Sequence, residues 1–151
     1  ALDDDTIILI KHHPIIKPYH IPHMPEELEG TFAVDVSDLL DIEELMIAAD
    51  VCITDYSSLI YEYSLLDKPL IFYAYDKERF CDWRGFYYDY DEMTPGPVCY
   101  TMEELIDVLT MPDYGYDPEE MKAFREKFMD SCDGHATERI EKLVFGESLR
   151  S

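Results

Sequence analysis

The segment that most constrains the fold is residues 49–76, with the sequence ADVCITDYSSLIYEYSLLDKPLIFYAYD. Two short apolar runs, 51–54 and 70–73, have the composition of strands that are buried on both faces. Between them, apolar residues recur at three- and four-residue steps from Leu59 to Leu66, which predicts a helix. A strand, a helix and a second strand joined at this spacing form a right-handed parallel crossover. The sequence therefore predicts an α/β fold with a parallel sheet.

The turn after the first of these strands contains Asp55, Ser57 and Ser58. Ligands of open α/β sheets bind at the carboxyl edge, where this turn must lie. A helix amino terminus offers free N–H groups to an anion, and either serine can cap the helix. Glu62 lies one helical turn further on, within reach of a sugar hydroxyl. A nucleotide diphosphate fits this pattern, and so do two serines that only cap the helix beside a solvated acid.

Similar patterns cover the rest of the chain. Strand composition recurs in residues 6–10, 31–35 and 98–100. Helical periodicity recurs in residues 41–49, 101–109, 119–130 and a terminal stretch through Val144. We expect a single doubly wound, Rossmann-like α/β domain with about five parallel strands flanked by helices.

The composition favours one soluble domain. At 151 residues the chain can bury a hydrophobic core, and its 47% apolar content argues against disorder. No apolar run approaches the roughly 20 residues of a membrane span, and no signal sequence opens the chain. The four cysteines lack metal-site spacing, which favours a reducing compartment. We therefore expect a cytoplasmic location.

The net charge limits the possible partners. The chain has 34 Asp and Glu against 12 Lys and Arg, a formal charge of -22. Such a charge repels nucleic-acid phosphates and anionic lipid headgroups. We expect no nucleic-acid partner.

The first predicted strand ends in Lys11, His12, His13 and Pro14. A histidine at a strand end can donate to a phosphoryl oxygen or act as an acid, because its pKa lies near working pH. Alternatively, it bonds only to nearby backbone.

The histidines also raise the possibility of a metal cluster. His20 and His23 follow His12 and His13 closely in the sequence. Intervening prolines predict an extended loop, no cysteine stands nearby, and there is no HExxH helix. We expect no metal site and no cofactor.

Arg84 follows the second strand of the central segment, within the sequence WRGFYY. A planar guanidinium beside a flexible glycine can hold two phosphate oxygens at once. Arg84 can equally stack on its aromatic neighbours or pair with Asp82 or Asp89. The run of tyrosines and aspartates that continues to Glu92 has no helical or strand period, which predicts a loop.

Four sequence motifs together resemble one enzyme family. TDYSS, LLDKPLIFYAYD, RGFYYDY and PGP are closely similar to the carboxy-terminal part of the CDP-glycerol glycerophosphotransferases, the teichoic acid polymerase and primase family. The resemblance extends from about Ile7 to Arg139. Because these enzymes are similar to GT-B glycosyltransferases, it implies two facing Rossmann-like domains, of which residues 1–151 form the one that binds the nucleotide donor. An acceptor-side domain, carrying a histidine base, is expected outside this chain.

The resemblance also implies a reaction and a set of site residues. An acceptor hydroxyl would attack the β-phosphorus of CDP-glycerol and release CMP. The catalytic residue would be His13, and the substrate-binding residues would be Lys11, His12, Asp55, Ser57, Ser58, Glu62 and Arg84. Residues 36–40 would lie beside the cytosine base, and Arg139 would be either structural or ligand-facing.

The remaining expectations concern partners. The acceptor would be a polymer or a lipid-linked primer, bound through the missing domain, which would also supply positive charge and any membrane contact. The parent enzyme would be peripheral on the inner face of the cell membrane, and this chain alone would be inactive. A transferase for CDP-ribitol or another nucleotide-activated polyol or sugar, and a non-catalytic nucleotide-binding module, remain alternatives.

Overall fold

A computed structural model describes residues 2, 5–16 and 21–146. Its strands are β1 (Ile8–Ile10), β2 (Ala33–Asp35), β3 (Cys52–Thr54), β4 (Leu70–Tyr73) and β5 (Val98–Cys99). Every strand pairing in the described part is parallel, as the sequence predicts. The strands form a two-stranded sheet, β1–β2, and a three-stranded sheet of order β3–β4–β5, instead of one continuous sheet. Strands this short offer few ladder hydrogen bonds, so sequence composition alone does not determine which edges pair.

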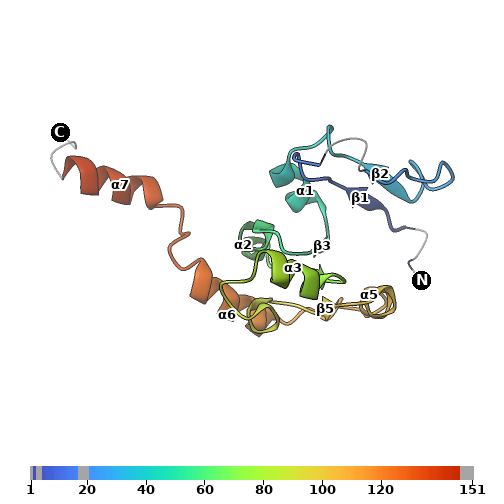
Figure 1. The fold of residues 1–151 in the computed structure, drawn as a ribbon. Coiled ribbons are helices and arrows are strands. Elements are labelled where there is room, and N and C mark those ends of the chain that lie inside the picture. The colour runs from blue at the N-terminus through green and yellow to red at the C-terminus, as the bar shows by residue number, and fades with distance from the viewer. Residues whose placement is uncertain (1, 3–4, 17–20, 147–151) are drawn as a thin grey trace.

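Helices connect and cover the strands (Figure 1). They are α1 (Ile42–Ala48), α2 (Leu59–Tyr63) with the 3-10 turn η2 (Ser64–Leu66), α3 (Lys77–Trp83), α4 (Tyr90–Met93), α5 (Met102–Leu109), α6 (Pro118–Phe128) and α7 (Ala136–Phe145). Helix α4 corrects the prediction of a loop through Glu92. Asp89 caps this single turn by accepting a hydrogen bond from the Asp91 N–H at 3.0 Å, and Tyr90 is buried. Four residues are too few to produce a visible period.

Strand β4 lies at the centre of the three-stranded sheet and is buried on both faces. Leu70 and Phe72 point into a cluster with Ile60 and Tyr63 of α2 and with residues of α6. Ile71 points the other way, into a cluster with residues of β5 and α5. Helices therefore cover both faces of this sheet, which is the doubly wound arrangement expected for a continuous apolar strand.

The Asp-Lys-Pro sequence after η2 connects three helices. The Lys68 ammonium donates to the carbonyls of Ile47 at 2.6 Å and Ala49 at 2.7 Å, at the carboxyl end of α1. Asp67 has a left-handed backbone with φ of 52° and forms an ion pair with Arg125 of α6. The sequence indicated only a helix stop here, but these two side chains also join α1 and α6 to the end of η2.

Helix α7 extends away from the rest of the described chain (Figure 1). All its residues are exposed, including the apolar side chains of Ile140 and Leu143. None of the described helices is long and apolar enough to cross a membrane.

Candidate functional site

Most of the candidate residues lie at strand carboxyl ends, whereas Glu62 lies within α2 and Arg84 at the C-cap of α3. Lys11 to His13 follow β1, and Asp55 to Ser58 follow β3. Because β1 and β3 belong to different sheets, they present two separate groups. Among the described residues, no hydrogen bond or ion pair joins one group to the other.

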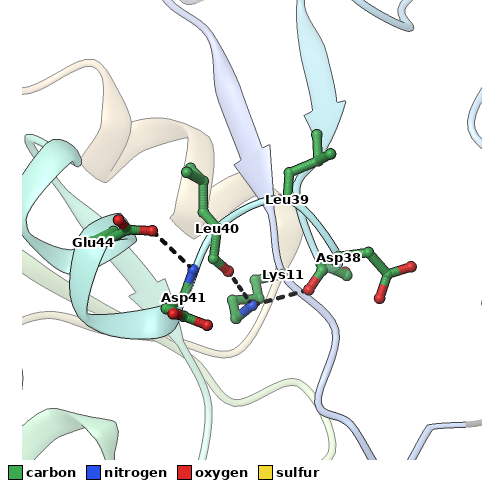
Figure 2. Close-up of a pocket in the computed structure, with 7 residues that line it drawn as sticks. Lys11, Asp38, Leu39, Leu40, Asp41 and Glu44 are labelled. Atoms are coloured by element: carbon green, nitrogen blue, oxygen red, sulfur yellow. Dashed lines mark hydrogen bonds between the residues drawn. The ribbon is translucent and has the colours of Figure 1, made fainter.

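Lys11 is bound to the loop between β2 and α1. Its Nζ donates to the carbonyl of Ser37 at 3.1 Å and to that of Leu40 at 2.6 Å (Figure 2). An ammonium has three N–H donors, so one is left for a ligand. Lys11 therefore has a structural role that the sequence did not indicate, beside any contact with phosphate.

His12 takes part in the same strand-end network. Its backbone N–H donates to the Ser37 hydroxyl at 2.9 Å, and its Nε2 lies 3.8 Å from a carboxylate oxygen of Asp35. Hydrogen bonds from the Ser37 hydroxyl and backbone N–H hold the pKa of the Asp35 carboxyl below its ordinary value, and the nearby His12 adds to this effect. The network links the ends of β1 and β2.

His13 is exposed, and its Nδ1 accepts a hydrogen bond from the Ile15 backbone N–H at 3.1 Å. In a neutral imidazole, a nitrogen that accepts leaves the proton on the other nitrogen. Nε2 is therefore the donor, and it makes no hydrogen bond to a described residue. The backbone contact considered as an alternative is present, but it uses only one of the two nitrogens.

The histidines do not assemble a metal centre in the described part of the chain. No group of three or more His, Cys, Asp or Glu there is placed to hold an ion. His23 is exposed, and His20 lies outside the described residues.

A small pocket of about 150 Å³ lies beside Lys11 (Figure 2). Its lining consists of Lys11, Ser37, Asp38, Leu39, Leu40, Asp41 and Glu44. One carboxylate, that of Glu44, accepts from the Asp41 N–H at 3.3 Å and so closes the first turn of α1. Apart from Lys11, the lining offers mainly carboxylates and carbonyls, so this part of the pocket suits groups that donate N–H or O–H.

The turn between β3 and α2 has two serine hydroxyls, of which only that of Ser57 forms a hydrogen bond to a described residue. Ser57 Oγ accepts from the Leu59 N–H at 3.2 Å. Ser58 occupies the N-cap position, is exposed, and makes no side-chain capping bond. Asp55 and Glu62 are also exposed, and neither carboxylate forms an ion pair with a described residue. The turn and the start of α2 therefore carry one exposed hydroxyl and two exposed carboxylates.

Arg84 is exposed at the C-cap of α3, and its guanidinium lies 5.0 Å from the centroid of the Trp83 ring. This contact is one of the alternatives that the sequence left open, the stacking of Arg84 on an aromatic neighbour. Within the described range Arg84 forms no ion pair with Asp82 or Asp89, so its N–H donors are available to phosphate.

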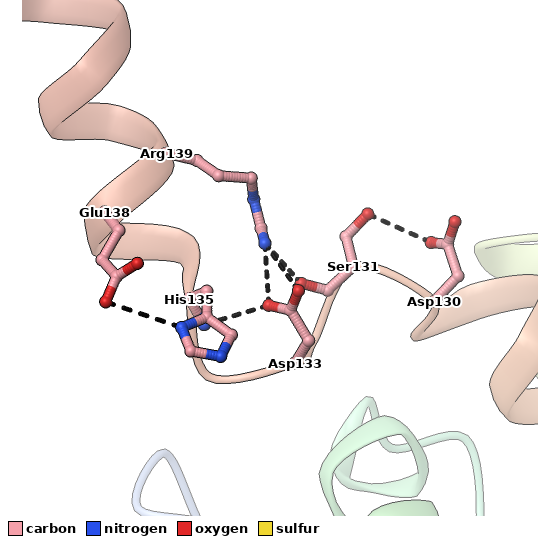
Figure 3. A network of polar contacts seen from close by, with 6 residues as sticks. All are labelled: Asp130, Ser131, Asp133, His135, Glu138 and Arg139. Atoms are coloured by element: carbon pink, nitrogen blue, oxygen red, sulfur yellow. Dashed lines mark hydrogen bonds and ion pairs between the residues drawn. The ribbon is translucent and has the colours of Figure 1, made fainter. Parts of the chain in front are cut away.

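Arg139 has a structural partner (Figure 3). Its NH1 bonds to both carboxylate oxygens of Asp133 at 2.8 Å, and its NH2 donates to the Ser131 carbonyl at 2.7 Å. The pKa of the Asp133 carboxyl is lowered by the Arg139 bond. Of the two alternatives for Arg139, the structure shows the structural one.

Sequence reasoning missed two residues at the same edge. Asp76 and Lys77 follow β4; Asp76 accepts from the Tyr56 hydroxyl at 2.9 Å, and Lys77 forms an ion pair with Asp91. The hydrogen bond to Asp91 raises the pKa of Lys77. Both residues could have been identified from the rule that ligands bind at the carboxyl ends of parallel strands, because they follow β4 as the other candidates follow β1 and β3.

The comparison with known proteins is consistent across sequence and structure. The family model for CDP-Glycerol:Poly(glycerophosphate) glycerophosphotransferase matches residues 1–146. The chain is 38% identical over 146 residues to a teichoic acid poly(ribitol-phosphate) polymerase of Bacillus spizizenii, covering 95% of this chain and 23% of that protein. It is also 38% identical over 148 residues to a teichoic acid glycerol-phosphate transferase of Staphylococcus aureus, covering 96% of this chain and 36% of that one.

Among solved structures, the wall teichoic acid polymerase TagF matches with a TM-score of 0.74 and 34% identity, over 93% of this chain and 34% of TagF. A TagF variant soaked with CDPG matches with a TM-score of 0.73. The chain thus spans between about a quarter and about a third of the length of these relatives. It belongs to the CDP-glycerol:poly(glycerophosphate) glycerophosphotransferase family.

Proposed function

We propose that this chain is the donor-binding domain of an enzyme that transfers glycerol phosphate from CDP-glycerol to an acceptor hydroxyl, in the synthesis of a teichoic acid-like or capsular polymer. The observation that carries the proposal is the family match over residues 1–146. The placement of the candidate residues after β1 and β3 supports it, because parallel α/β sheets bind ligands at this edge.

The proposed chemistry is an in-line displacement at the β-phosphorus of CDP-glycerol. The bond from the acceptor oxygen to phosphorus forms while the bond from phosphorus to the bridging oxygen breaks, so that a phosphodiester and CMP result. Charge develops on the phosphoryl oxygens and on the departing CMP. His13 Nε2–H is the donor proposed to meet this charge, and the remaining N–H of Lys11 and the guanidinium of Arg84 would add to it.

The donor's other groups are assigned by chemical complementarity. Ser57, Ser58 and the adjacent backbone N–H groups would hold phosphate, and His12 would contact the donor from the separate group after β1. The carboxylates of Asp55 and Glu62 would accept from ribose or glycerol hydroxyls. The pocket lined by residues 37–41 would receive the amino edge of cytosine, because its lining offers carbonyls and carboxylates.

The acceptor is proposed to bind outside this chain. A polyanionic polymer or lipid-linked primer needs positive charge, and this chain has a net charge of -22. A further part of the protein, peripheral on the inner face of the cell membrane, would supply the acceptor site, the membrane contact and the base. The proposal that donor and acceptor bind to different parts of the protein is supported by relatives in which the matched region is only 23% to 36% of the protein.

A kinetic prediction follows for His13. In a full-length enzyme, His13→Ala should lower turnover far more than donor affinity, because a donor to the transferring phosphoryl group matters most as charge develops. Steady-state kinetics with CDP-glycerol and a primed acceptor would measure both. His23→Ala is the control, since His23 is exposed further along the same connection between β1 and β2. Near-normal turnover of His13→Ala would remove His13 from the proposal, and turnover by residues 1–151 alone would remove the need for a second domain.

The donor is tested by calorimetric titration of the 151-residue chain with CDP-glycerol, CDP-ribitol, UDP-glucose and CMP. CDP-ribitol is a real competitor, because a ribitol-phosphate polymerase and a glycerol-phosphate transferase are each 38% identical to this chain. We expect the two CDP ligands and CMP to bind and UDP-glucose to bind more weakly. Equal affinity for UDP-glucose would argue for a different activated donor, and no binding of any nucleotide would reject the donor-domain assignment.

A further inference from the structure

Tyr56 lies inside the turn that carries Ser57 and Ser58, and its ring packs into an aromatic cluster with Phe80, Phe86 and Tyr90. Its ring stacks on Phe80 of α3 with the centroids 4.0 Å apart. It also contacts Tyr90 of α4 at 5.4 Å. The Tyr56 hydroxyl donates to Asp76 Oδ1 at 2.9 Å, so the turn after β3 is tied to the end of β4.

A second tyrosine, Tyr90, binds the backbone of the same turn. Tyr90 is only 4% exposed, and its hydroxyl donates to the backbone carbonyl of Asp55 at 2.9 Å. The two hydrogen bonds therefore hold adjacent residues of one turn, Asp55 through its carbonyl and Tyr56 through its side chain. Both partners come from the segment between β4 and β5.

The turn needs this external support because its own helix is short. Helix α2 has five residues, and the chain then continues as the 3-10 turn η2. A helix of little more than one turn does not hold its amino terminus rigidly by itself. A phosphate site made of hydroxyl and N–H donors works only if those donors are held in place before the ligand arrives.

We propose that Tyr56 and Tyr90 are positioning residues that fix the Ser57–Ser58 turn against the segment from Asp76 to Met93. The inference rests on the proposed function, in which this turn holds the phosphate of the donor. Neither tyrosine touches the ligand; both act through the backbone of the turn.

Two further observations fit this role. Burial raises the pKa of Tyr56 and of Tyr90, so both hydroxyls stay protonated and remain donors throughout the working pH range. Arg84 is the C-cap of α3, the helix whose Phe80 stacks on the Tyr56 ring. The turn and Arg84, the proposed phosphate clamp, are therefore joined through α3.

The test uses the 151-residue chain with Tyr56→Phe, Asp76→Ala and Asp76→Asn. The amide oxygen of asparagine still accepts from the Tyr56 hydroxyl, so this variant should restore what alanine loses. Tyr61→Phe is the matched control: its ring packs on Phe124, and its hydroxyl makes no hydrogen bond to a described residue.

Two readouts separate the inference from the proposed function. Hydrogen exchange of peptides that cover residues 55–61 needs no ligand, and we expect roughly tenfold faster exchange in Tyr56→Phe and Asp76→Ala, the loss of one hydrogen bond to a charged acceptor. Calorimetric titration with CDP-glycerol should show a similar roughly tenfold loss of affinity in these two variants. Asp76→Asn and Tyr61→Phe should stay near wild type in both.

The outcomes are distinct. Unchanged exchange in Tyr56→Phe would show that the turn is rigid without the bond and would overturn the inference. Faster exchange with unchanged CDP-glycerol affinity would show a bond that is only structural, which also overturns it. If the wild type binds no nucleotide, the proposed function fails, and the positioning role for the donor site fails with it, whatever the exchange result.

Discussion

Lys68 illustrates how one side chain can join two parts of this fold. Its ammonium donates to three carbonyls at the carboxyl end of α1, two of them within 2.7 Å. A cation at this position satisfies backbone acceptors that have no partner within the helix and interacts favourably with the helix dipole. The sequence LLDKP predicted a helix stop but gave no sign of this contact, because Ile47 lies 21 residues away.

We expect Lys68→Met to lower the free energy of unfolding by about 1 to 3 kcal/mol, since methionine keeps the apolar stem but leaves the carbonyls without their charged donor. Urea unfolding would measure the change. Lys122→Met is the control, because Lys122 is exposed on α6 and forms no ion pair with a described residue. Equal stability of the two variants would mean that water replaces the Lys68 ammonium at no cost.

Lys11 shows the limit of residue-level prediction. The family resemblance implies a phosphate contact for Lys11, which stays a prediction; the structure shows in addition that its ammonium donates to the carbonyls of Ser37 and Leu40. Those carbonyls are 26 and 29 positions away in the sequence. Contacts of a side chain with distant backbone leave no pattern in the sequence, because any residue supplies the same carbonyl. His13 was more predictable, since its backbone contact is local.

At the level of elements, the strands of the crossover were predicted well and the segment between β4 and β5 was not. Residues 70–73 form β4 as expected, because four consecutive apolar residues fit a strand buried on both faces. Helices α3 and α4 depend on aromatic contacts between distant rings and on the Asp89 cap, which a local periodicity does not detect. The missed segment is also the one that carries Asp76, Lys77 and Tyr90.

A pH prediction belongs to this segment. The hydrogen bond from Lys77 lowers the pKa of Asp91 below its ordinary 3.8, and the Tyr100 hydroxyl adds to the effect. Because the folded pKa is lower than the unfolded one, the contribution to stability is present above about pH 4 and is lost as the pH falls through the folded value.

We therefore expect Asp91→Asn to be less stable than wild type at pH 6 and to approach wild type below the ordinary carboxyl pKa. Urea unfolding from about pH 6 down to about pH 3 would follow the difference. Glu92→Gln is the control, since the exposed Glu92 forms no ion pair within the described residues. A difference between Asp91→Asn and wild type that persists unchanged at low pH would contradict the ion-pair account.

For the whole molecule, self-repulsion is the dominant electrostatic effect. Acidic residues outnumber basic ones by 34 to 12, so most carboxylates have no cation beside them.

We expect added sodium chloride at pH 7 to raise the melting temperature. At 1 M salt the Debye length falls to about 3 Å, and the salt screens the repulsion among carboxylates more than it weakens the few ion pairs. Thermal scans with an uncharged osmolyte as control would measure this. A melting temperature that falls with salt would mean that the surface ion pairs dominate.

The class of fold and the family could be predicted from the sequence, because buried strands and the TDYSS and RGFYYDY motifs are local features. The division of the five strands into two sheets could not, since strands of two to four residues do not specify their partners by composition. The crossover rule placed the Ser57–Ser58 turn directly after β3, while the roles of the site residues stay predictions.

The central claim is that the turn after β3 binds the phosphate of a cytidine nucleotide. The most direct measurement is calorimetric titration of the 151-residue chain and of the Ser57→Ala, Ser58→Ala double variant with CDP-glycerol, with Ser131→Ala as a control far along the chain. Urea unfolding would confirm that the double variant is folded, because Ser57 also accepts from the Leu59 N–H. We predict that the double variant loses about 1 to 3 kcal/mol of binding free energy, while Ser131→Ala binds as the wild type does. Equal affinity of the double variant and the wild type would contradict the account.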